Sequence, residues 1–509
     1  MNTRTRPSLS FLKFFSILIL VCALGISSTV LQASQPLKLT ILYMNDPHAH
    51  YEPYQDGSAK ELIGGFAKAQ TVIKEILSAN KAQGRETLIF LAGDLLMGTP
   101  FSTAFKGRLG IELMNKMNFM AMTVGNHEFD YGQENLFNTL RPMMKFPLLS
   151  ANTTSESGGY LFDRTVEKRF PKFSAKAVIL GLTTSDTAIM THPKNVKGLV
   201  FRDPIQTARE LLKVVNKDDL IIALTHIGVD EDKKLASACP RINVIIGGHS
   251  HTALLQPLRV GDTIVCQAGA YSKYVGRLDI EVQKGCVTRY SGRLILLGPD
   301  TKPDEEIESI ISEHKKLMDA SLNEVIGKTQ VFLDGTEKNV RSGHDTNLGR
   351  LIASNMATGS GSDVAMINGG SIRGSLKEGD ITLNDIYTVL PFSNTEVTMN
   401  LTGNDLLAAL ERNASLEPGS GGKLQTFGIK YRIDQGTVRI DDIRGKGFAP
   451  ETTYSVAVND FLAAGGDGYT VFKENGKNYY DSSLLVTDLL IDFIKAKKVI
   501  SQETLDSML

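Results

Sequence analysis

The chain has 509 residues, more than one ordinary domain needs, and this length predicts two to four domains. Hydrophobic residues make up 42% and charged residues 22%, without a low-complexity tract, so the composition is that of a soluble globular protein rather than a disordered one. The formal net charge of -1 excludes a broad basic surface for a nucleic-acid polymer, and any anion must therefore be attracted locally.

The first element that we predict is a secretory signal peptide over residues 1–34. Arg4, Arg6 and Lys13 precede the apolar run FFSILILVCALGI, and the small residues of LQAS follow it. This order is typical of a signal peptide, and the run is shorter than the roughly 20 apolar residues of a membrane span. We therefore expect a periplasmic or secreted protein with no membrane span after cleavage, with an uncleaved anchor as the alternative.

Strand-like runs alternate with amphipathic segments between residues 35 and 300. The runs LKLTILYM, TLIFLA, DLIIALT and INVIIGG are rich in Ile, Val and Leu, and polar clusters follow them. Such runs are typical of strands covered on both faces, whereas AKAQTVIKEILSANKAQG has the spacing of a helix. The pattern predicts an α/β sandwich, with function expected at the carboxyl ends of its strands.

The cysteines give little support for a stabilising disulfide or for a cysteine-ligated metal cluster. Cys239, Cys266 and Cys286 remain after the signal peptide, and no CxxC spacing occurs. A disulfide scaffold is not expected in so long a chain. Inert buried thiols are the favoured interpretation, with one disulfide among the three as the alternative.

Histidines and acidic residues gather in the loops after the predicted strands. A lone histidine there usually has a structural role, but six of the chain's 9 histidines fall in four of five such loops, which chance does not explain. Imidazole and carboxylate groups suit Zn, Mn, Fe or Co, and the lack of cysteine argues against a structural zinc site. The residues concerned are Asp46, His48, His50, Asp94, Asn126, His127, Glu128, Asp130, His226, His249 and His251.

The number and spacing of these groups indicate two metal ions. Asp46 and His48 lie two positions apart, as do His249 and His251, so each pair would point to one side of an extended segment. The set is too large for one ion, whereas two divalent ions about 3.5–4 Å apart, sharing a carboxylate and a hydroxide, would use it. Two such ions, two aspartates and a hydroxide leave a charge of about +1, which would attract anions locally.

We predict a linker helix over residues 301–327 and a second domain over residues 328–509. Pro303 opens a charged segment with apolar residues at helical spacing, and Gly327 closes it. The second domain has its own loops, NGGSIRG, PFSNTEV and NDFLAAGGDGY, and no internal repeat relates it to the first half.

The blocks D-x-H, G-D, G-N-H-E, H and G-H-x-H occur in this order along the first domain. They resemble the pattern of calcineurin-like metallophosphoesterases, and with the second domain they are similar to the bacterial periplasmic 5′-nucleotidase and UDP-sugar hydrolase family. The resemblance implies a four-layer α/β/β/α sandwich over residues 35–300, joined by the helix to an α/β nucleotide-binding domain over residues 328–509. It also implies that domain rotation brings the substrate to the metals. We expect a monomer.

The resemblance assigns the metal ligands residue by residue. One divalent ion would be held by Asp46, His48 and His251, at the last of which the family often has Gln or Asn. The choice among Zn, Mn, Co and Fe stays open. The second ion would be held by Asn126, His226 and His249, with Asp94 bridging the two.

The resemblance also gives His127 and Asp130 catalytic roles. His127 would contact the phosphoryl oxygens, while Asp130 accepts a hydrogen bond from its other ring nitrogen and raises the pKa of the imidazole. The implied reaction is in-line attack on phosphorus by a water that two metals activate. It would release phosphate from nucleoside 5′-monophosphates and could also cleave nucleotide-sugar pyrophosphates.

The second domain would bind the substrate. Leu424 stands where a stacking aromatic is expected, so we predict that Phe427 replaces it; without that contact, worth about 1–3 kcal/mol, nucleotide affinity would fall. Phe461 would stack on the other face of the base. By the same resemblance the remaining contacts are Asn368 and Arg373, Arg341 in a segment one residue longer than expected, and Asp467 on the ribose.

Two other functions remain compatible with the sequence. A 2′,3′-cyclic nucleotide phosphodiesterase with 3′-nucleotidase activity would share both domains. A non-catalytic metal-binding surface protein belongs to a different class, and the complete ligand set argues against it.

Overall fold

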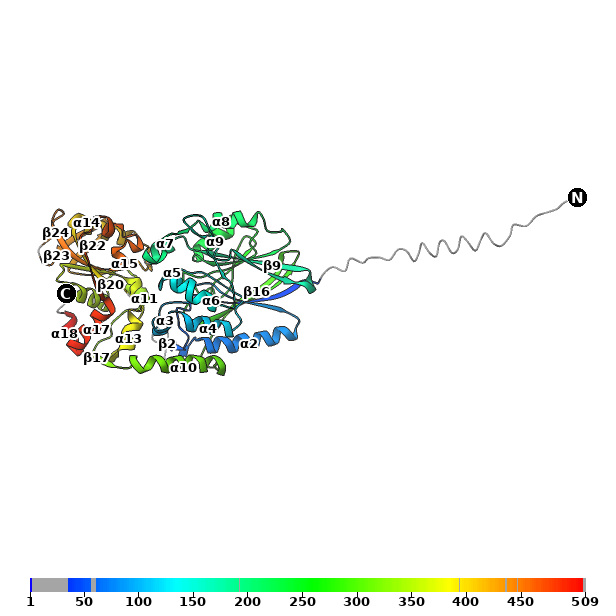
Figure 1. The fold of residues 1–509 in the computed structure, drawn as a ribbon, viewed down its shortest axis with the longest axis horizontal. Helices are drawn as coiled ribbons and strands as arrows, with labels where there is room; N and C mark the ends of the chain where they lie inside the picture. The colour runs from blue at the N-terminus through cyan, green and yellow to red at the C-terminus, as the bar shows by residue number, and fades with distance from the viewer. Residues whose placement is uncertain are drawn as a thin grey trace.

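The computed structural model describes, apart from Met1, residues 35–506 without 56–60, 192, 393, 435–436 and 446. The predicted signal peptide therefore lies outside the described residues. Two domains lie side by side and α10 (Glu305–Leu322) runs along both (Figure 1). None of the helices in the described part of the chain has both the length and the apolar character that crossing a membrane requires.

The first domain, here called the metal domain, contains two six-stranded sheets. In each sheet a parallel core is extended by antiparallel strands at the edge. One sheet has the order β16 (Cys286–Leu296), β15 (Tyr274–Gln283), β1 (Leu37–Met44), β4 (Glu86–Leu91), β5 (Ala121–Thr123), β6 (Leu148–Leu149). The other has the order β13 (Leu258–Val260), β14 (Thr263–Cys266), β12 (Val244–Ile246), β11 (Leu220–His226), β9 (Ala175–Thr183), β8 (Thr165–Phe170).

Strand periodicity stacks this domain in four layers. Ile41 of β1 and Ile222 of β11 belong to one core between the two sheets. Their neighbour Leu42 faces α2 (Phe66–Ala82) and α4 (Arg108–Lys116), and Ile221 faces α8 (Pro204–Leu212) and α9 (Val229–Ala238). Because successive side chains alternate in direction, each sheet is buried on both faces. The predicted α/β/β/α sandwich is confirmed.

The helix α10 connects the domains. Asp304 caps it by accepting a hydrogen bond from Ile307 N at 3.3 Å, and three glutamates in its first turn suit the positive end of the helix dipole. Ile307 and Ile311 are buried in the same core as Phe66 of α2. The helix is thus anchored to the metal domain by its apolar stripe.

The second domain, here called the substrate domain, is a five-stranded sheet covered by helices on both faces. Ile367 packs with α12 (Asn347–Ser360) and α17 (Val486–Lys497), whereas Met366 packs with α14 (Gly403–Ser415) and α16 (Thr470–Asn475). The order of strands is β21 (Leu424–Phe427), β18 (Val364–Asn368), β24 (Thr453–Asn459), β20 (Thr395–Thr402), β25 (Lys477–Leu485).

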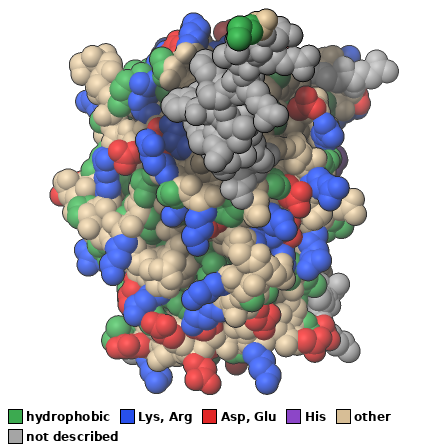
Figure 2. All heavy atoms as spheres, turned by 90° about the vertical axis from the view of Figure 1, so that its right-hand side faces the viewer, with side chains coloured by type: hydrophobic (Ala, Val, Ile, Leu, Met, Phe, Trp, Pro, Cys, Tyr) green, Lys and Arg blue, Asp and Glu red, His purple; other side chains and the backbone are tan. Residues whose placement is uncertain are grey.

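The surface and the cysteines agree with the composition. On the end of the metal domain shown in Figure 2, Lys and Arg side chains are interspersed with Asp and Glu. Cys239 and Cys266 are buried, Cys286 is exposed, and all three thiols of the described residues are free. The inert-thiol interpretation therefore holds for Cys239 and Cys266, while Cys286 is accessible.

Candidate active site

The five loops predicted to carry the site meet at one edge of the metal domain. They follow β1, β4, β5, β11 and β12, whose parallel strands present their carboxyl ends together. Within the described residues, three groups of side chains bring potential metal-binding atoms within 4.8 Å of one another. They are Asp46 with His48 and His251, His48 with Asp94 and His127, and Asp94 with His226 and His249.

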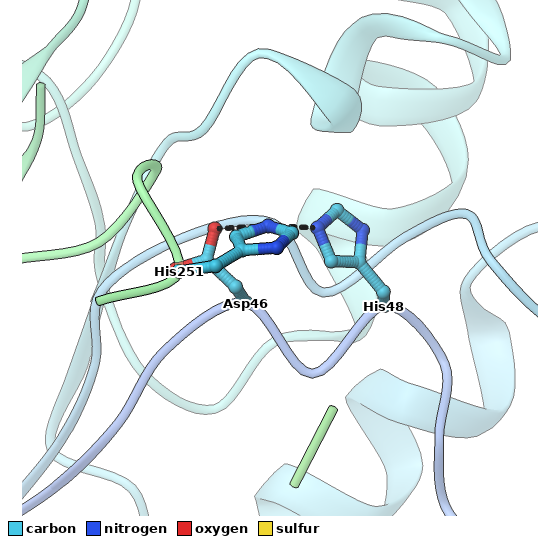
Figure 3. Close-up of side chains that lie close together, drawn as sticks. All are labelled: Asp46, His48 and His251. Carbon is cyan, nitrogen blue, oxygen red and sulfur yellow. Dashed lines mark hydrogen bonds and ion pairs between the residues drawn. The ribbon is translucent and has the colours of Figure 1, made fainter. Parts of the chain in front are cut away.

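The first group is formed by Asp46, His48 and His251. The Nε2 atoms of His48 and His251 lie 3.0 Å apart, and Nε2 of His251 lies 3.5 Å from Oδ1 of Asp46 (Figure 3). Asp46 and His48 are fully buried. Their ligand atoms converge on one point, as predicted for the first metal site.

The second group is formed around Asp94. Nε2 of His226 lies 3.0 Å from Oδ2 of Asp94, and Nε2 of His48 lies 3.8 Å from the same oxygen. On the other side, Nδ1 of His249 lies 3.1 Å from Oδ1 of Asn126. Asp94 stands between the two groups, where a bridging carboxylate is expected.

The hydrogen bonds of these imidazoles fit divalent cations. Nδ1 of His226 lies 2.7 Å from Ala92 O, and Nδ1 of His48 lies 3.1 Å from Leu96 O, so each Nδ1 is the natural donor and each Nε2 carries a lone pair. Among the described residues, the buried Nε2 of His226 has no hydrogen-bond partner. Neutral nitrogens and two aspartates facing one point need a positive charge that a cation supplies.

The electrostatics of the group indicate the same charge deficit. Burial lowers the pKa of His226, but Asp94 and Asp46 outweigh it and raise that pKa to about 10. Burial, with His226 nearby, lowers the pKa of His249 to about 4. The aspartates therefore favour a positive charge at His226, which a cation bound to its neutral Nε2 would supply, while His249 stays a neutral ligand.

Left-handed turns, rather than extended segments, aim the ligands. Asp46 and His48 follow the end of β1 with φ of 50° and 46°, and His249 and His251 have φ of 78° and 53°. Non-glycine residues adopt such angles rarely, and they cluster at functional sites. The predicted alternation is therefore wrong: Asp46 and His48 share a group, but His249 and His251 belong to different ones.

Glu128 holds the loops after β4 and β5 together. Its fully buried carboxylate accepts hydrogen bonds from the backbone of Asp94 at 3.0 Å, Leu95 at 2.8 Å and Gly125 at 2.7 Å. A Cβ at Gly125 would collide with the Asp94 carboxylate. Glycine and glutamate in this block thus place Asp94, and Glu128 has a structural role.

His127 is supported by a short chain of hydrogen bonds. Its Nδ1 lies 2.5 Å from Oδ2 of Asp130, and Oδ1 of Asp130 accepts from the Thr191 hydroxyl at 2.7 Å. Asn195 donates to Asp130 O at 2.9 Å. Burial lowers the pKa of His127, but Asp130 and Asp94 outweigh it, and the net shift is upward. A cationic imidazole facing the cavity suits a phosphoryl group.

His50 lies behind the first group of ligands. Its Nδ1 is 2.9 Å from His48 O, and its ring lies 4.5 Å from that of Tyr271. Burial lowers the pKa of His50 to about 4. These contacts give His50 a supporting position behind His48 rather than a place on the open surface.

A cavity of about 350 Å³ joins the ligand groups to the substrate domain. Arg341 and Arg373 line it, and among the described residues neither Arg341 Nε nor Arg373 Nη2 has a hydrogen-bond partner, although both atoms are buried. Buried guanidinium donors need an anion or water. Both arginines are therefore placed where a phosphate would lie.

The part of the cavity lined by the substrate domain suits a nucleoside. Phe461 and Asp467 line it, and Asn368 Nδ2 donates to Oδ2 of Asp467 at 3.0 Å. Asn459 Nδ2 in turn donates to Oδ1 of Asn368 at 3.0 Å. Burial raises the pKa of Asp467 to about 6. An aromatic face beside a fixed carboxylate matches a base and its ribose.

The predicted substrate contact of Phe427 has no support in this arrangement. Phe427 lines a separate hollow, where Arg444 lies 5.5 Å over its ring, and Leu424 is buried in the core under α14. Besides Phe461, the aromatic side chains that line the cavity are Tyr131 and Phe392, and the ring of Phe392 lies 6.0 Å from that of His127. Phe392 belongs to the PFSNTEV loop, but sequence alone did not single it out.

The comparisons with known proteins agree with this geometry. Residues 39–253 match the calcineurin-like phosphoesterase family, and residues 325–474 match the 5′-nucleotidase C-terminal domain. A 5′-nucleotidase from Vibrio vulnificus is 31% identical, with 91% of each chain covered. The trifunctional nucleotide phosphoesterase protein YfkN from Bacillus subtilis is 33% identical over 86% of this chain, which spans only 32% of that protein. The structure of a 5′-nucleotidase precursor from Thermus thermophilus superposes with a TM-score of 0.80 at 32% identity, covering 91% of this chain and 97% of that one.

The sandwich fold and its clustered aspartates and histidines define a phosphoester hydrolase of the two-metal, calcineurin-like class. The second domain and the length of the matches narrow this class. The chain belongs to the 5′-nucleotidase family.

Proposed function

We propose that the protein hydrolyses nucleoside 5′-monophosphates and releases phosphate. One observation carries this proposal: a single cavity is lined both by aspartate and histidine groups of the metal domain and by Phe461 and Asp467 of the substrate domain. A nucleotide bound to the substrate domain would thus present its phosphate to the metal ligands. Cleavage of nucleotide-sugar pyrophosphates would use the same cavity.

Different residues of the chain would bind the substrate, orient its phosphate and stabilise charge during the reaction. When bound, the two ions would neutralise phosphoryl charge and lower the pKa of the attacking water. Arg341 and Arg373 would orient the phosphate, and the His127 imidazolium, held by Asp130, would stabilise the charge that builds up on the phosphoryl oxygens. Phe461 would fix the base, so that only a bound nucleotide is aligned for attack.

A panel of substrates tests this proposal. Purified protein supplied with Mn, Co or Zn should hydrolyse AMP, measured as released phosphate, faster than UDP-glucose, measured as released UMP, or bis(p-nitrophenyl) phosphate, measured as released p-nitrophenol. Preference for 2′,3′-cAMP over AMP would favour a cyclic phosphodiesterase instead. A chain that binds metals but hydrolyses none of these esters would be a metal-binding protein without this activity.

We propose in addition that the protein acts outside the cytoplasm as a monomer. The order of basic, apolar and small residues over positions 1–34 supports export. Mass spectrometry of the secreted fraction should find a mature chain starting near residue 35, and light scattering should give the mass of one chain.

A further inference from the structure

The cavity is lined by residues of both domains, and several contacts cross the domain boundary. One such contact joins Lys377 Nζ to Oε1 of Gln55 at 2.5 Å, and another joins the Thr103 hydroxyl to Pro391 O at 3.4 Å. Small polar interfaces of this kind leave domains free to move. A contact beside the cavity would control how substrate groups face the metal ligands.

Glu337 makes such a contact. It begins α11 (Glu337–Val340) of the substrate domain, and its Oε2 accepts a hydrogen bond from the Tyr271 hydroxyl of the metal domain at 3.1 Å. Its Oε1 lies 2.6 Å from Nη1 of Arg341 and 3.7 Å from Nδ1 of His251. One carboxylate thus bridges a cavity arginine and the metal domain.

Tyr271 is built into the metal site from the other side. Its ring lies 5.4 Å from that of His251 and 5.8 Å from that of His48, and its backbone N donates to Asp46 O at 2.8 Å. Tyr271 and Ser272 both adopt positive φ, 58° and 55°. Two successive non-glycine residues in this region are costly and persist where the surroundings require them. The hydroxyl of Tyr271 is therefore in a fixed place relative to the ligands.

We propose that Glu337 is a positioning residue that ties Arg341 of the substrate domain to Tyr271 of the metal domain and so sets the phosphate-binding arginine against the metal ligands. The side chain of Glu337 is 39% exposed. A half-exposed ion pair adds little to stability, so this tie is suited to making and breaking as the domains move. The function of Glu337 would then be alignment rather than folding.

The inference rests on the proposed function for its kinetic readout only. Tyr271→Phe removes the hydroxyl and keeps the ring, and Glu337→Ala removes the carboxylate. Each should lower kcat about tenfold, because a hydrogen bond to a charged group is lost in the aligned state. The KM of Tyr271→Phe should stay nearly constant, since the nucleoside contacts of Phe461 and Asp467 lie within the substrate domain. The double variant should be no slower than Glu337→Ala.

A distance measurement separates this inference from the enzymatic activity. One spin label is attached to the exposed Cys286 and the other to Glu503→Cys, and Cys22→Ser removes a further site of labelling. Double electron–electron resonance then measures the distance between the two domains. Tyr271→Phe and Glu337→Ala should each broaden the distribution of distances and keep the metal content of the wild type. Lys377→Ala, which removes a different interdomain contact, serves as the control and should leave kcat unchanged.

Unchanged distances in both variants would overturn the inference, as would losses in kcat that multiply in the double variant. A higher KM with wild-type kcat in Glu337→Ala would instead show a role in substrate binding alone. If no ester is hydrolysed, the proposed function fails, yet the distance distributions still decide whether the tie exists.

Discussion

At the scale of single residues, His127 is the side chain whose surroundings differ most from those of the neighbouring ligands. The imidazoles of His48 and His226 have Nδ1 next to a backbone carbonyl, whereas Nδ1 of His127 faces the carboxylate of Asp130. A carbonyl acceptor at Nδ1 leaves Nε2 free to bind a cation, while a carboxylate at Nδ1 favours the protonated imidazole. This contrast separates a charge-stabilising histidine from metal ligands, although His127 also lies within reach of Asp94.

Replacement of this imidazole gives a direct test. His127→Ala should lower turnover of AMP by at least about a hundredfold while two metal ions per chain are retained. Elemental analysis and steady-state kinetics on the same preparation make the measurement. Loss of one ion would show instead that His127 is a ligand. Thr191→Val, which removes only the hydroxyl that supports Asp130, should give a smaller loss of roughly threefold to tenfold.

A second residue gives a prediction about pH. Glu396 on β20 is 2% exposed, Oε1 has no hydrogen-bond partner among the described residues, and burial raises its pKa from 4.5 to about 7. The folded state then holds a proton that the unfolded state releases between pH 4.5 and 7, so stability falls as the pH rises through this window. Glu396→Gln should match the wild type at pH 5 and exceed it at pH 8 by roughly 2 kcal/mol. Thermal unfolding at the two pH values measures this, and equal differences at both would contradict it.

At the scale of elements, the strand ends were predictable and the turns beyond them were not. Runs such as LKLTILYM identify strands from composition alone, and parallel strands bring their carboxyl ends together, so Asp46 and Asp94 were correctly placed near each other. Asp46 and His48 adopt positive φ although neither is a glycine, so the sequence does not indicate the left-handed turns at these positions. Phe427 shows the same limit: it ends β21 and lies in another hollow.

The loops after β4 and β5 depend on one glutamate, which gives a prediction at this scale. Glu128→Gln replaces a carboxylate that accepts three backbone hydrogen bonds with an amide that has a single acceptor oxygen. At least one buried donor loses its partner, at a cost of roughly 1–3 kcal/mol. Unfolding temperature and metal affinity should both fall. Glu134→Gln, an exposed change in the same region, is the matched control and should alter neither.

At the scale of the whole molecule, the residues that sequence analysis missed are those whose role arises from contact between domains. Phe392, Tyr271 and Glu337 lie outside the metal-binding and phosphate-binding motifs, and the contacts of Phe392 with His127 and of Tyr271 with Glu337 form only where the domains meet. Spacing along the chain reports neighbours within an element, whereas contacts between positions 271 and 337 follow from how α10 joins the two domains. Motifs therefore predicted the metal site better than the substrate site.

The two-domain arrangement also predicts how the metals contribute to stability. Every proposed ligand comes from the metal domain, so ions that bind its folded form stabilise that domain and leave the substrate domain unaffected. In calorimetry, a chelator should shift only one unfolding transition to lower temperature. Restoring Mn at a concentration 100-fold above its dissociation constant should raise the free energy of unfolding of the metal domain by about 2.7 kcal/mol.

Asp94→Asn separates this effect from general damage. The side chain of Asp94 lies between both ligand groups, so removing its charge should weaken the binding of both ions. The unfolding transition of the metal domain should then be insensitive to the chelator. The transition of the substrate domain should remain at its wild-type temperature, because the hydrogen bonds of Asp94 join loops of the metal domain. A chelator that shifted both transitions equally would contradict this prediction, because the two domains would then unfold as one unit. The interface between the domains would in that case be far stronger than its few polar contacts indicate.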